Sequence, residues 1–331
     1  METIKNIIFI SLLTMTLFSA CNKDEEELII PDTGIPLVYA DSTYGVKVEK
    51  GIEYAKGLVH SNWNSDMYST KSLTLDIYEP DDATSENRPA IIIFHGGGFY
   101  GGDSEKETNI DMANHFASRG WVAICINYRL HAENGTVPQA WVDYMSVIGT
   151  NALRIYPATR DAKASIRWLY ANAEEYKVNT DFITVGGGSA GCNISLSLGI
   201  TDPEDFTNEL TLAEDPTLAT THLNQPSKVH TILDFWGGLT GVELTNAIYG
   251  VNRYDSNDPS VLIVHGTEDP TVNVDQAYRI AEIYDSLEIY NELYLLEGRG
   301  HGPWDAIING KGLIEYASEF VINQQNLTVV Q

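Results

Sequence analysis

Short apolar runs that alternate with amphipathic stretches constrain this chain more than any other feature of its sequence. The runs at 90–94 and 122–126 are unbroken, and others rich in apolar residues follow at 182–185, 229–235, 261–265 and 293–296. Strands buried on both faces of a sheet have this composition, and the segments between them then form helices that cover both faces. We therefore predict an α/β fold with a mostly parallel central sheet and helices on both faces.

Helices are expected wherever apolar residues recur at helical spacing. Within 157–176, for example, Ala162, Ile166, Leu169 and Ala173 share one face. The other expected helices run from a cap at Asp103-Ser104 to about Gly120, and over 190–199, 275–287 and 303–321.

Three further stretches of the chain have a different pattern. Residues 73–77 alternate between apolar and polar, as expected of an outer strand. Two longer excursions, 131–156 and 201–228, interrupt the strand–helix rhythm. Long connections of this kind often cover a functional site.

Composition favours one large domain and excludes one class of partner. The chain has 331 residues, 43% of them hydrophobic, which is enough for a single large core. Its 46 Asp and Glu against 20 Lys and Arg give a formal net charge of -26. Such a field repels phosphate backbones, so we expect no nucleic-acid partner. The charge is otherwise interpreted as a well-solvated acidic surface.

The first twenty residues have the pattern of a signal peptide. Lys5 precedes an apolar stretch at 7–18 that is too short to span a membrane comfortably. The run 17–21 resembles the lipobox of bacterial lipoproteins, although Phe18 departs from its usual aliphatic residue. Lipidation of Cys21 would supply a lipid anchor, and we expect the protein to contact a membrane through this anchor only.

These features predict an exported lipoprotein at the outer membrane or cell surface of a Gram-negative bacterium. A plain secreted protein cut near Ala20 is the alternative. The following residues, 22–27, read NKDEEE and resemble the acidic surface-export signal of lipoproteins in some polysaccharide-degrading Gram-negative bacteria. A solvated tether is the other interpretation of this charge run.

One serine is surrounded by glycines. Residues 187–191 read GGSAG, a G-x-S-x-G pattern between a predicted strand and a predicted helix. A serine on a tight, strained turn points its oxygen out above the sheet, and the flanking glycines leave room for the helix to pack. Ser189 is therefore a candidate nucleophile.

A second glycine-rich loop follows the strand at 90–94. It reads His95-Gly96-Gly97-Gly98-Phe99, and backbone amides without side chains can close around a developing oxyanion. A phosphate-binding loop would need a Lys-Ser or Lys-Thr pair, or a third spaced glycine opening a helix, where this chain has Phe99-Tyr100.

Two further loops complete a set of catalytic candidates. Asp269 lies in the loop after 261–265, and His301 lies in a glycine-flanked loop after 293–296. The chain order is then Ser, Asp, His. In these roles His301 takes the serine proton while Asp269 fixes the imidazole tautomer. Glu268 and Asp275 are alternative acids; His265 and His95 are better explained as structural.

These motifs together resemble the α/β-hydrolase superfamily, close to carboxylesterases with an HGGG oxyanion motif and their feruloyl-esterase-like relatives, over residues 54–322. The resemblance implies oxyanion donors at Gly97, Gly98 and Ala190, and it places the triad acid at Asp269. It also implies structural roles for the residues at 128–130 and for Asp161. Residues 1–20 are then the signal peptide, 21–50 a tether and lead-in, and 51–325 the catalytic domain.

The chain departs from the lipase-like branch of that superfamily at three places. Gly188 stands where this branch usually has Asp, Cys192 replaces a second glycine after Gly191, and the segment after Leu130 is longer than usual. These departures favour esterases that trim plant or algal polysaccharides over lipid-acting enzymes.

A few side chains outside these motifs are candidates for binding roles. Trp141, Tyr144 and Met145 in the first excursion, and Trp236 after the strand at 229–235, are candidates for a pocket that holds a sugar or phenolic ring, although such aromatic residues are more often core. Cys125 and Cys192 are expected to be buried free thiols. The eight histidines form no metal-binding pair such as H-E-x-x-H, so we expect no metal and no cofactor.

The sequence thus predicts a serine carboxylesterase acting through an acyl-enzyme on small-molecule or carbohydrate esters with short acyl or hydroxycinnamoyl groups. One alternative keeps the fold but cleaves amides, as an aminopeptidase or formamidase would. The other is a non-catalytic surface lipoprotein that binds glycans.

Overall fold

The computed structural model describes residues 34–81 and 86–331. The predicted signal peptide, Cys21 and the acidic run at 22–27 lie outside these residues. In the part of the chain that is described, none of the helices has both the length and the apolar composition that a membrane span requires.

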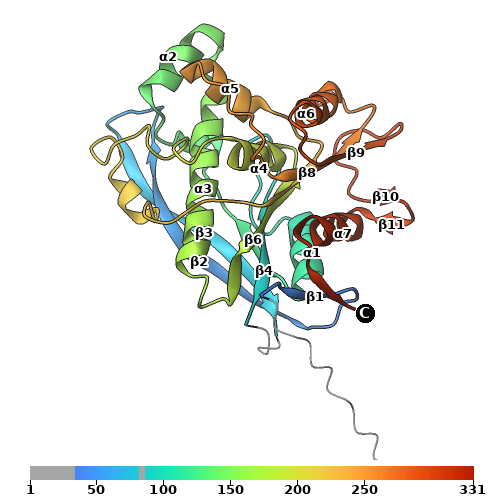
Figure 1. The fold of residues 1–331 in the computed structure, drawn as a ribbon. Helices are drawn as coiled ribbons and strands as arrows, with labels where there is room; N and C mark the ends of the chain where they lie inside the picture. The colour runs from blue at the N-terminus through green and yellow to red at the C-terminus, as the bar shows by residue number, and fades with distance from the viewer. Residues whose placement is uncertain (1–33, 82–85) are drawn as a thin grey trace, which may run out of the picture. The chain divides into compact units, whose positions relative to one another are not determined.

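Eight strands form the central sheet of the described chain in the order β2-β3-β5-β4-β6-β7-β8-β9 (Figure 1). β3 pairs antiparallel with β2 and β5, and the remaining neighbours are parallel, which confirms the predicted mostly parallel sheet. The strands are β2 (Val46–His60), β3 (Tyr68–Pro80), β4 (Arg88–Phe94), β5 (Val122–Ile126), β6 (Val178–Gly188), β7 (Thr231–Phe235), β8 (Ser260–Gly266) and β9 (Asn291–Leu296).

Helices cover both faces of this sheet, and each face has its own apolar core (Figure 1). On one face lie α3 (Ile155–Ala171), α4 (Ala190–Ile200), α5 (Thr240–Tyr249) and α6 (Asp275–Ser286). On the other lie α1 (Glu107–Ala117) and α7 (Leu313–Gln325), which contact each other. The unbroken apolar composition of β4 and β5 follows from this arrangement, because all their side chains are buried.

The predicted outer strand at 73–77 is not at the edge of the sheet. It belongs to β3, and β2 pairs along its outer side. The sequence predicts no strand over the residues of β2, of which 46–50 fall in the expected lead-in. One compact unit spans Gly34–Gln331, and β1 (Leu37–Tyr39) pairs with β12 (Thr328–Val330) near its other end.

Two predicted helices begin later than expected. Ser104 does not cap α1, because its hydroxyl donates to Asp76 Oδ2 at 2.7 Å and its amide to Asn127 Oδ1 at 2.9 Å. α7 starts at Leu313 because a hairpin, β10 (Ile307–Ile308) and β11 (Lys311–Gly312), precedes it. Asn309 and Gly310 form the turn of that hairpin with positive φ, an Asn-Gly signal present in the sequence.

The two excursions contain short helices of their own. The first holds η1 (His131–Glu133), α2 (Gln139–Ile148) and η2 (Thr150–Arg154), and the second holds η3 (Pro216–Thr220). A buried ion pair between Arg160 Nη2 and Asp215 Oδ2, 2.7 Å apart, ties the second excursion to α3.

Another buried ion pair fixes the chain after β5. Asp161 of α3 accepts from the guanidinium of Arg129 at 2.6 Å and 2.8 Å and from the Arg129 amide at 2.9 Å. Both side chains are almost fully buried, so removing either one would leave an uncompensated charge.

Candidate active site

The predicted site loops meet at one edge of the sheet. β4, β6, β8 and β9 are parallel, so their carboxyl ends lie together, and the loops that carry Gly97, Ser189, Asp269 and His301 follow these four ends in turn.

Ser189 occupies the single residue between β6 and α4, with φ 59° and ψ -115°. This conformation is strained for a residue other than glycine. A Cβ added to Gly187 or Gly191 would lie 2.1 Å from the Phe94 carbonyl oxygen. The two outer glycines of the motif are therefore required by the close approach of α4 to the end of β4.

The three predicted triad side chains lie within hydrogen-bonding distance of one another. His301 Nε2 is 2.9 Å from Ser189 Oγ, and His301 Nδ1 is 2.7 Å from Asp269 Oδ2. His301 is partly exposed, whereas the Asp269 side chain is fully buried. The structure thus places Asp269, rather than Glu268 or Asp275, against the imidazole.

The Asp269 carboxylate is held by its own loop. Oδ1 accepts the amides of Thr271 at 2.8 Å and Val272 at 3.0 Å. Burial alone would raise the pKa of Asp269, but these amides and the bond from His301 outweigh it, and the pKa lies below the usual value. The carboxylate is therefore ionised where it faces the imidazole.

The HGGG loop presents backbone amides beside Ser189. Gly97 and Gly98 have φ values of 125° and 62°, and a Cβ on Gly97 would lie 2.1 Å from the Gly101 carbonyl oxygen. Their carbonyls are used elsewhere: Gly97 O accepts from Tyr100 N at 3.0 Å, and Gly98 O accepts from Arg154 Nε at 3.0 Å. The amides of Gly97, Gly98 and Ala190 have no hydrogen-bond acceptor among the described residues.

His95 braces this loop, as the sequence suggested. Its Nδ1 lies 2.9 Å from Gly96 O, and its ring stacks on Tyr128 with centroids 4.1 Å apart. Tyr128 also donates its hydroxyl to the His95 carbonyl at 2.7 Å. Burial lowers the pKa of His95 to about 4, so this imidazole is neutral near pH 7.

A cavity of about 270 Å³ opens beside the serine and includes Gly98 and Ala190. Among its lining residues, Arg154 alone carries a permanent charge, and its guanidinium lies 4.3 Å above the Tyr100 ring. The rest of the lining is Phe99, Ile155, Asn193, Gly237, Gly238, Thr240, Thr271, Val272 and Gln276.

The aromatic residues proposed for a ring-binding pocket do not line this cavity. Trp141 and Met145 pack in the core instead, with the Trp141 ring against Tyr156, and the partly buried Tyr144 packs against that core. Trp236 is 1% exposed and packs edge-on against Trp304. These side chains were misassigned because aromatic residues in a long excursion have the same sequence pattern whether they face a ligand or the core.

Apart from Gly98, Ser189 and Ala190, the residues that line the cavity are not predicted from the sequence. Arg154 and Asn193 reach it because α3 and α4 begin at the same edge of the sheet, and Gln276 reaches it from the first turn of α6. No local motif marks them. For Asn193 and Gln276, position in the first turn of a helix that follows a site loop is the one available signal.

Two departures from the lipase-like pattern have packing explanations. A Cβ on Gly188 would lie 2.9 Å from Trp304 Cζ2 and 3.1 Å from Trp236 Nε1, so these indoles occupy the space that a larger side chain would need. The Cys192 thiol is buried between β6 and β7, 2.8 Å from Gly187 O and 2.9 Å from Phe235 O. Cys125 and Cys192 are both free and buried, as predicted.

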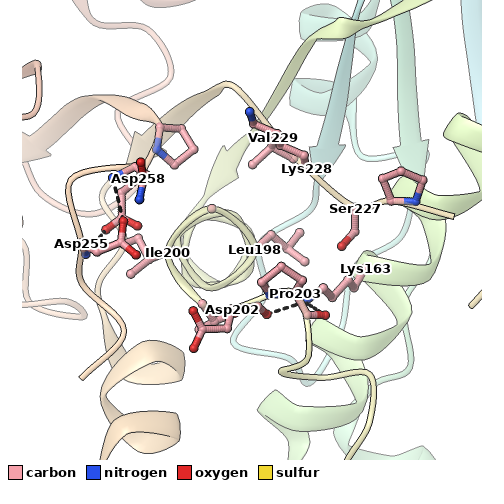
Figure 2. A pocket seen from close by; sticks show the side chains of 15 residues that line it. Lys163, Leu198, Ile200, Asp202, Pro203, Ser227, Lys228, Val229, Asp255 and Asp258 are labelled. Atoms are coloured by element: carbon pink, nitrogen blue, oxygen red, sulfur yellow. Dashed lines mark hydrogen bonds between the residues drawn. The ribbon is translucent and has the colours of Figure 1, made fainter. Parts of the chain in front are cut away.

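A second cavity, of about 320 Å³, lies at the opposite end of α4 (Figure 2). Leu198 and Ile200 line it from the helix, with Lys163, Asp202 and Asp258 around them. It is remote from Ser189, which lies at the first turn of the same helix. The described residues contain no cluster of three or more His, Cys, Asp or Glu that could hold a metal ion.

The sheet order, the helices on both faces and the serine turn after β6 define the α/β-hydrolase fold. Within that class the chain belongs to the BD-FAE family, whose model matches residues 75–149 and 140–246.

Several curated proteins that are similar to this chain are named as esterases. Esterase LipC of Mycobacterium tuberculosis is 24% identical over 248 residues, which are 69% of this chain and 56% of the relative. The probable carboxylic ester hydrolase LipM of the same organism is 30% identical over 132 residues, 40% of this chain and 26% of the relative. The chain thus spans about half or less of the length of these curated relatives.

Solved structures similar to this chain have the same fold. Thermogutta terrifontis esterase 2 phosphorylated by paraoxon has a TM-score of 0.61 and 24% identity, covering 84% of this chain and 94% of that one. The two curated relatives are themselves named as an esterase and a probable carboxylic ester hydrolase.

Proposed function

We propose that this protein is a serine carboxylesterase in which Ser189 is the nucleophile, His301 the general base and acid, and Asp269 the orienting carboxylate. One observation carries the proposal: Ser189 Oγ, His301 and Asp269 form a continuous hydrogen-bonded chain with separations of 2.9 Å and 2.7 Å. The names of the relatives support ester hydrolysis as the reaction.

Acylation follows from this geometry. Ser189 Oγ attacks the ester carbonyl carbon while its proton passes to His301 Nε2, and the carbonyl oxygen becomes an oxyanion. The amides of Gly97, Gly98 and Ala190 donate to that oxygen. Asp269, ionised and fixed by two amides, stabilises the imidazolium.

The tetrahedral intermediate then collapses. The bond from carbon to the alcohol oxygen breaks, His301 returns the proton to that oxygen, and the alcohol leaves with the acyl group bound to Ser189. A water molecule repeats the sequence: His301 takes its proton, the acyl bond to Ser189 breaks, and the proton returns to Ser189 Oγ. The products are one carboxylic acid and one alcohol.

We propose short acyl and hydroxycinnamoyl esters, including those that decorate polysaccharides, as substrates. The cavity beside Ser189, about 270 Å³, is slightly smaller than the usual range for small-molecule sites. The site also differs from the lipase-like branch at Gly188, where Trp304 and Trp236 occupy the space that a larger side chain would need.

Hydrolysis of a substrate series tests the proposal. We expect the purified protein to hydrolyse p-nitrophenyl acetate and butyrate, and methyl ferulate, much faster than p-nitrophenyl octanoate, with Ser189→Ala as the blank. Cleavage of an aminoacyl anilide faster than the aryl ester of the same acyl group would instead favour an amidase.

We also propose that Cys21 is lipidated and that the anchor holds the enzyme at the outer membrane or cell surface. The support is the lipobox-like run at 17–21 and the acidic residues after it. Detergent partitioning of the full chain and of Cys21→Ser, expressed in a Gram-negative host, tests this. Equal partitioning of both into the aqueous phase contradicts it.

A further inference from the structure

A second Asp–His pair lies behind the triad acid and has no part in the mechanism above. Asp234 of β7 and His265 of β8 are both 0% exposed. In the parallel register Asp234 is opposite Ile263, two residues before His265, so both side chains project from the same face of the sheet. Burial raises the pKa of Asp234, and the Cys192 thiol and His265 oppose the rise.

His265 contacts the structure that holds the triad acid. Its Nε2 lies 3.0 Å from the Val272 carbonyl oxygen, and since a carbonyl only accepts, Nε2 carries the proton. The amide of the same residue, Val272, donates to Asp269 Oδ1 at 3.0 Å. His265 Nε2 also lies 3.4 Å from Asp269 Oδ2, the oxygen bonded to His301. His265 therefore lies close to one carboxylate oxygen of Asp269 and, through its contact with Val272, helps to hold the amide that binds the other oxygen.

Asp234 contacts two other parts of the site. Its Oδ1 accepts the amide of Gly237 at 2.9 Å, and Gly237 lines the cavity beside Ser189. It also interacts with the thiol of Cys192, in the first turn of α4 three residues after the serine. Asp234 thus contacts the helix that carries the nucleophile, through Cys192, and the cavity wall, through Gly237.

Burial of Asp234 and His265 costs desolvation free energy that a purely structural role does not explain. Asp234 Oδ2 and His265 Nδ1 are buried and have no hydrogen-bond partner among the described residues. Apolar side chains of similar size would fill the same space without that desolvation cost. Retention of a carboxylate and an imidazole here indicates a role for their charge and hydrogen bonding.

We propose that Asp234 and His265 are positioning residues for the triad: His265 fixes the loop and orientation of Asp269, and Asp234 fixes the first turn of α4 and the cavity wall through Cys192 and Gly237. This rests on the proposed esterase activity. Neither side chain touches the substrate, so their loss acts on kcat rather than KM.

Three variants test the proposal with p-nitrophenyl acetate. His265→Leu keeps the volume but loses the donor to Val272, and we expect kcat to fall roughly 30- to 100-fold with KM within about threefold. His265→Gln restores an N–H donor, and kcat recovers to within about fivefold of wild type. Asp234→Asn, which keeps the shape, lowers kcat by roughly three- to tenfold.

If His265 only filled space, kcat would be higher in His265→Leu than in His265→Gln, because Leu fills an apolar site better than Gln. The control is Thr231→Val, on the same strand as Asp234, which loses the hydrogen bond from Gln325 Nε2 at 3.1 Å and should cost stability without changing kcat. If kcat of the Leu variant stays within twofold of wild type, or the Gln variant is no better than Leu, the proposal is overturned.

A measurement independent of turnover separates this inference from the proposed function. The proton between His301 Nδ1 and Asp269 gives a low-field NMR resonance, identified by its absence in Asp269→Asn. We expect the resonance in wild type and His265→Gln and its loss or broadening in His265→Leu. An unchanged resonance in folded His265→Leu contradicts the positioning role even if no ester is hydrolysed, whereas an inactive wild type with the expected resonances contradicts only the esterase assignment.

Discussion

Helix α4 begins at a cavity of about 270 Å³ that contains Ser189 and ends at one of about 320 Å³ that contains Ile200. At the first end the serine is held at φ 59° and three amides nearby lack acceptors among the described residues. At the other end the polar groups bond to the protein itself. Lys163 Nζ, for example, donates to the carbonyls of Asp202, Pro203 and Asp205 at 2.7 to 3.0 Å.

The comparison shows that neither cavity size nor a perturbed pKa distinguishes the two ends. Burial lowers the pKa of Lys163 to about 8 and raises that of Asp258 to about 7, both at the Ile200 end. Such shifts accompany burial in general and mark a site only together with convergent, unsatisfied groups. Strain at the serine and free amides beside it are what set the Ser189 end apart.

The largest expected effect is at the nucleophile. Ser189→Ala removes the attacking oxygen, and kcat/KM for p-nitrophenyl acetate should fall by roughly 10⁴- to 10⁶-fold. Ser195→Ala is the matched control on the same helix, since its hydroxyl donates to Gly191 O at 2.9 Å. It should retain activity within about threefold, and a Ser189→Ala protein that keeps wild-type turnover would place the chemistry elsewhere.

The next effect concerns the acid. Asp269→Asn keeps the shape of the loop but no longer stabilises the required tautomer of His301, so kcat should fall by roughly 10⁴-fold. Glu268→Gln, the neighbouring carboxylate, should change kcat by less than about threefold. The reverse order in steady-state kinetics would assign the acid to Glu268.

A smaller effect is expected at the oxyanion loop. A Cβ at Gly97 would lie 2.1 Å from Gly101 O and would be forced to a φ of 125°, so Gly97→Ala should displace its amide. We expect kcat to fall by roughly 10²- to 10³-fold with little change in KM. Gly101→Ala, where a Cβ has nothing within 4 Å, is the control in the same loop. Equal losses in both variants would indicate general disruption of the loop instead.

The smallest expected effect is at the far cavity. Asp258→Asn should leave kcat within twofold of wild type. Because the folded pKa of Asp258, about 7, exceeds the unfolded value of about 4, its contribution to wild-type stability is lost as pH rises through that window. Urea midpoints of the two proteins should therefore agree at pH 4 and favour the Asn variant at pH 8; a difference independent of pH would rule out this titration.

The fold and the three candidate catalytic residues could be predicted because their signals are local. The turn around Ser189 needs glycine at fixed positions, and buried parallel strands need apolar runs, so both appear in a few consecutive residues. The hairpin before α7 was also readable, since Asn309-Gly310 is a hairpin signal. The start of α1 was not, because Ser104 is hydrogen-bonded to Asp76 of β3 and to Asn127, which follows β5.

The sequence by itself determined the α/β architecture, the strained serine turn and the four loops that carry candidate chemistry. Only the tertiary structure decided which acid faces His301, which side chains line the cavity, and that Trp141 and Met145 belong to the core. It also placed Asp234 and His265 behind Asp269. The physical reason is that these outcomes depend on distances between residues far apart in the chain, which sheet register and helix packing set and no local pattern encodes.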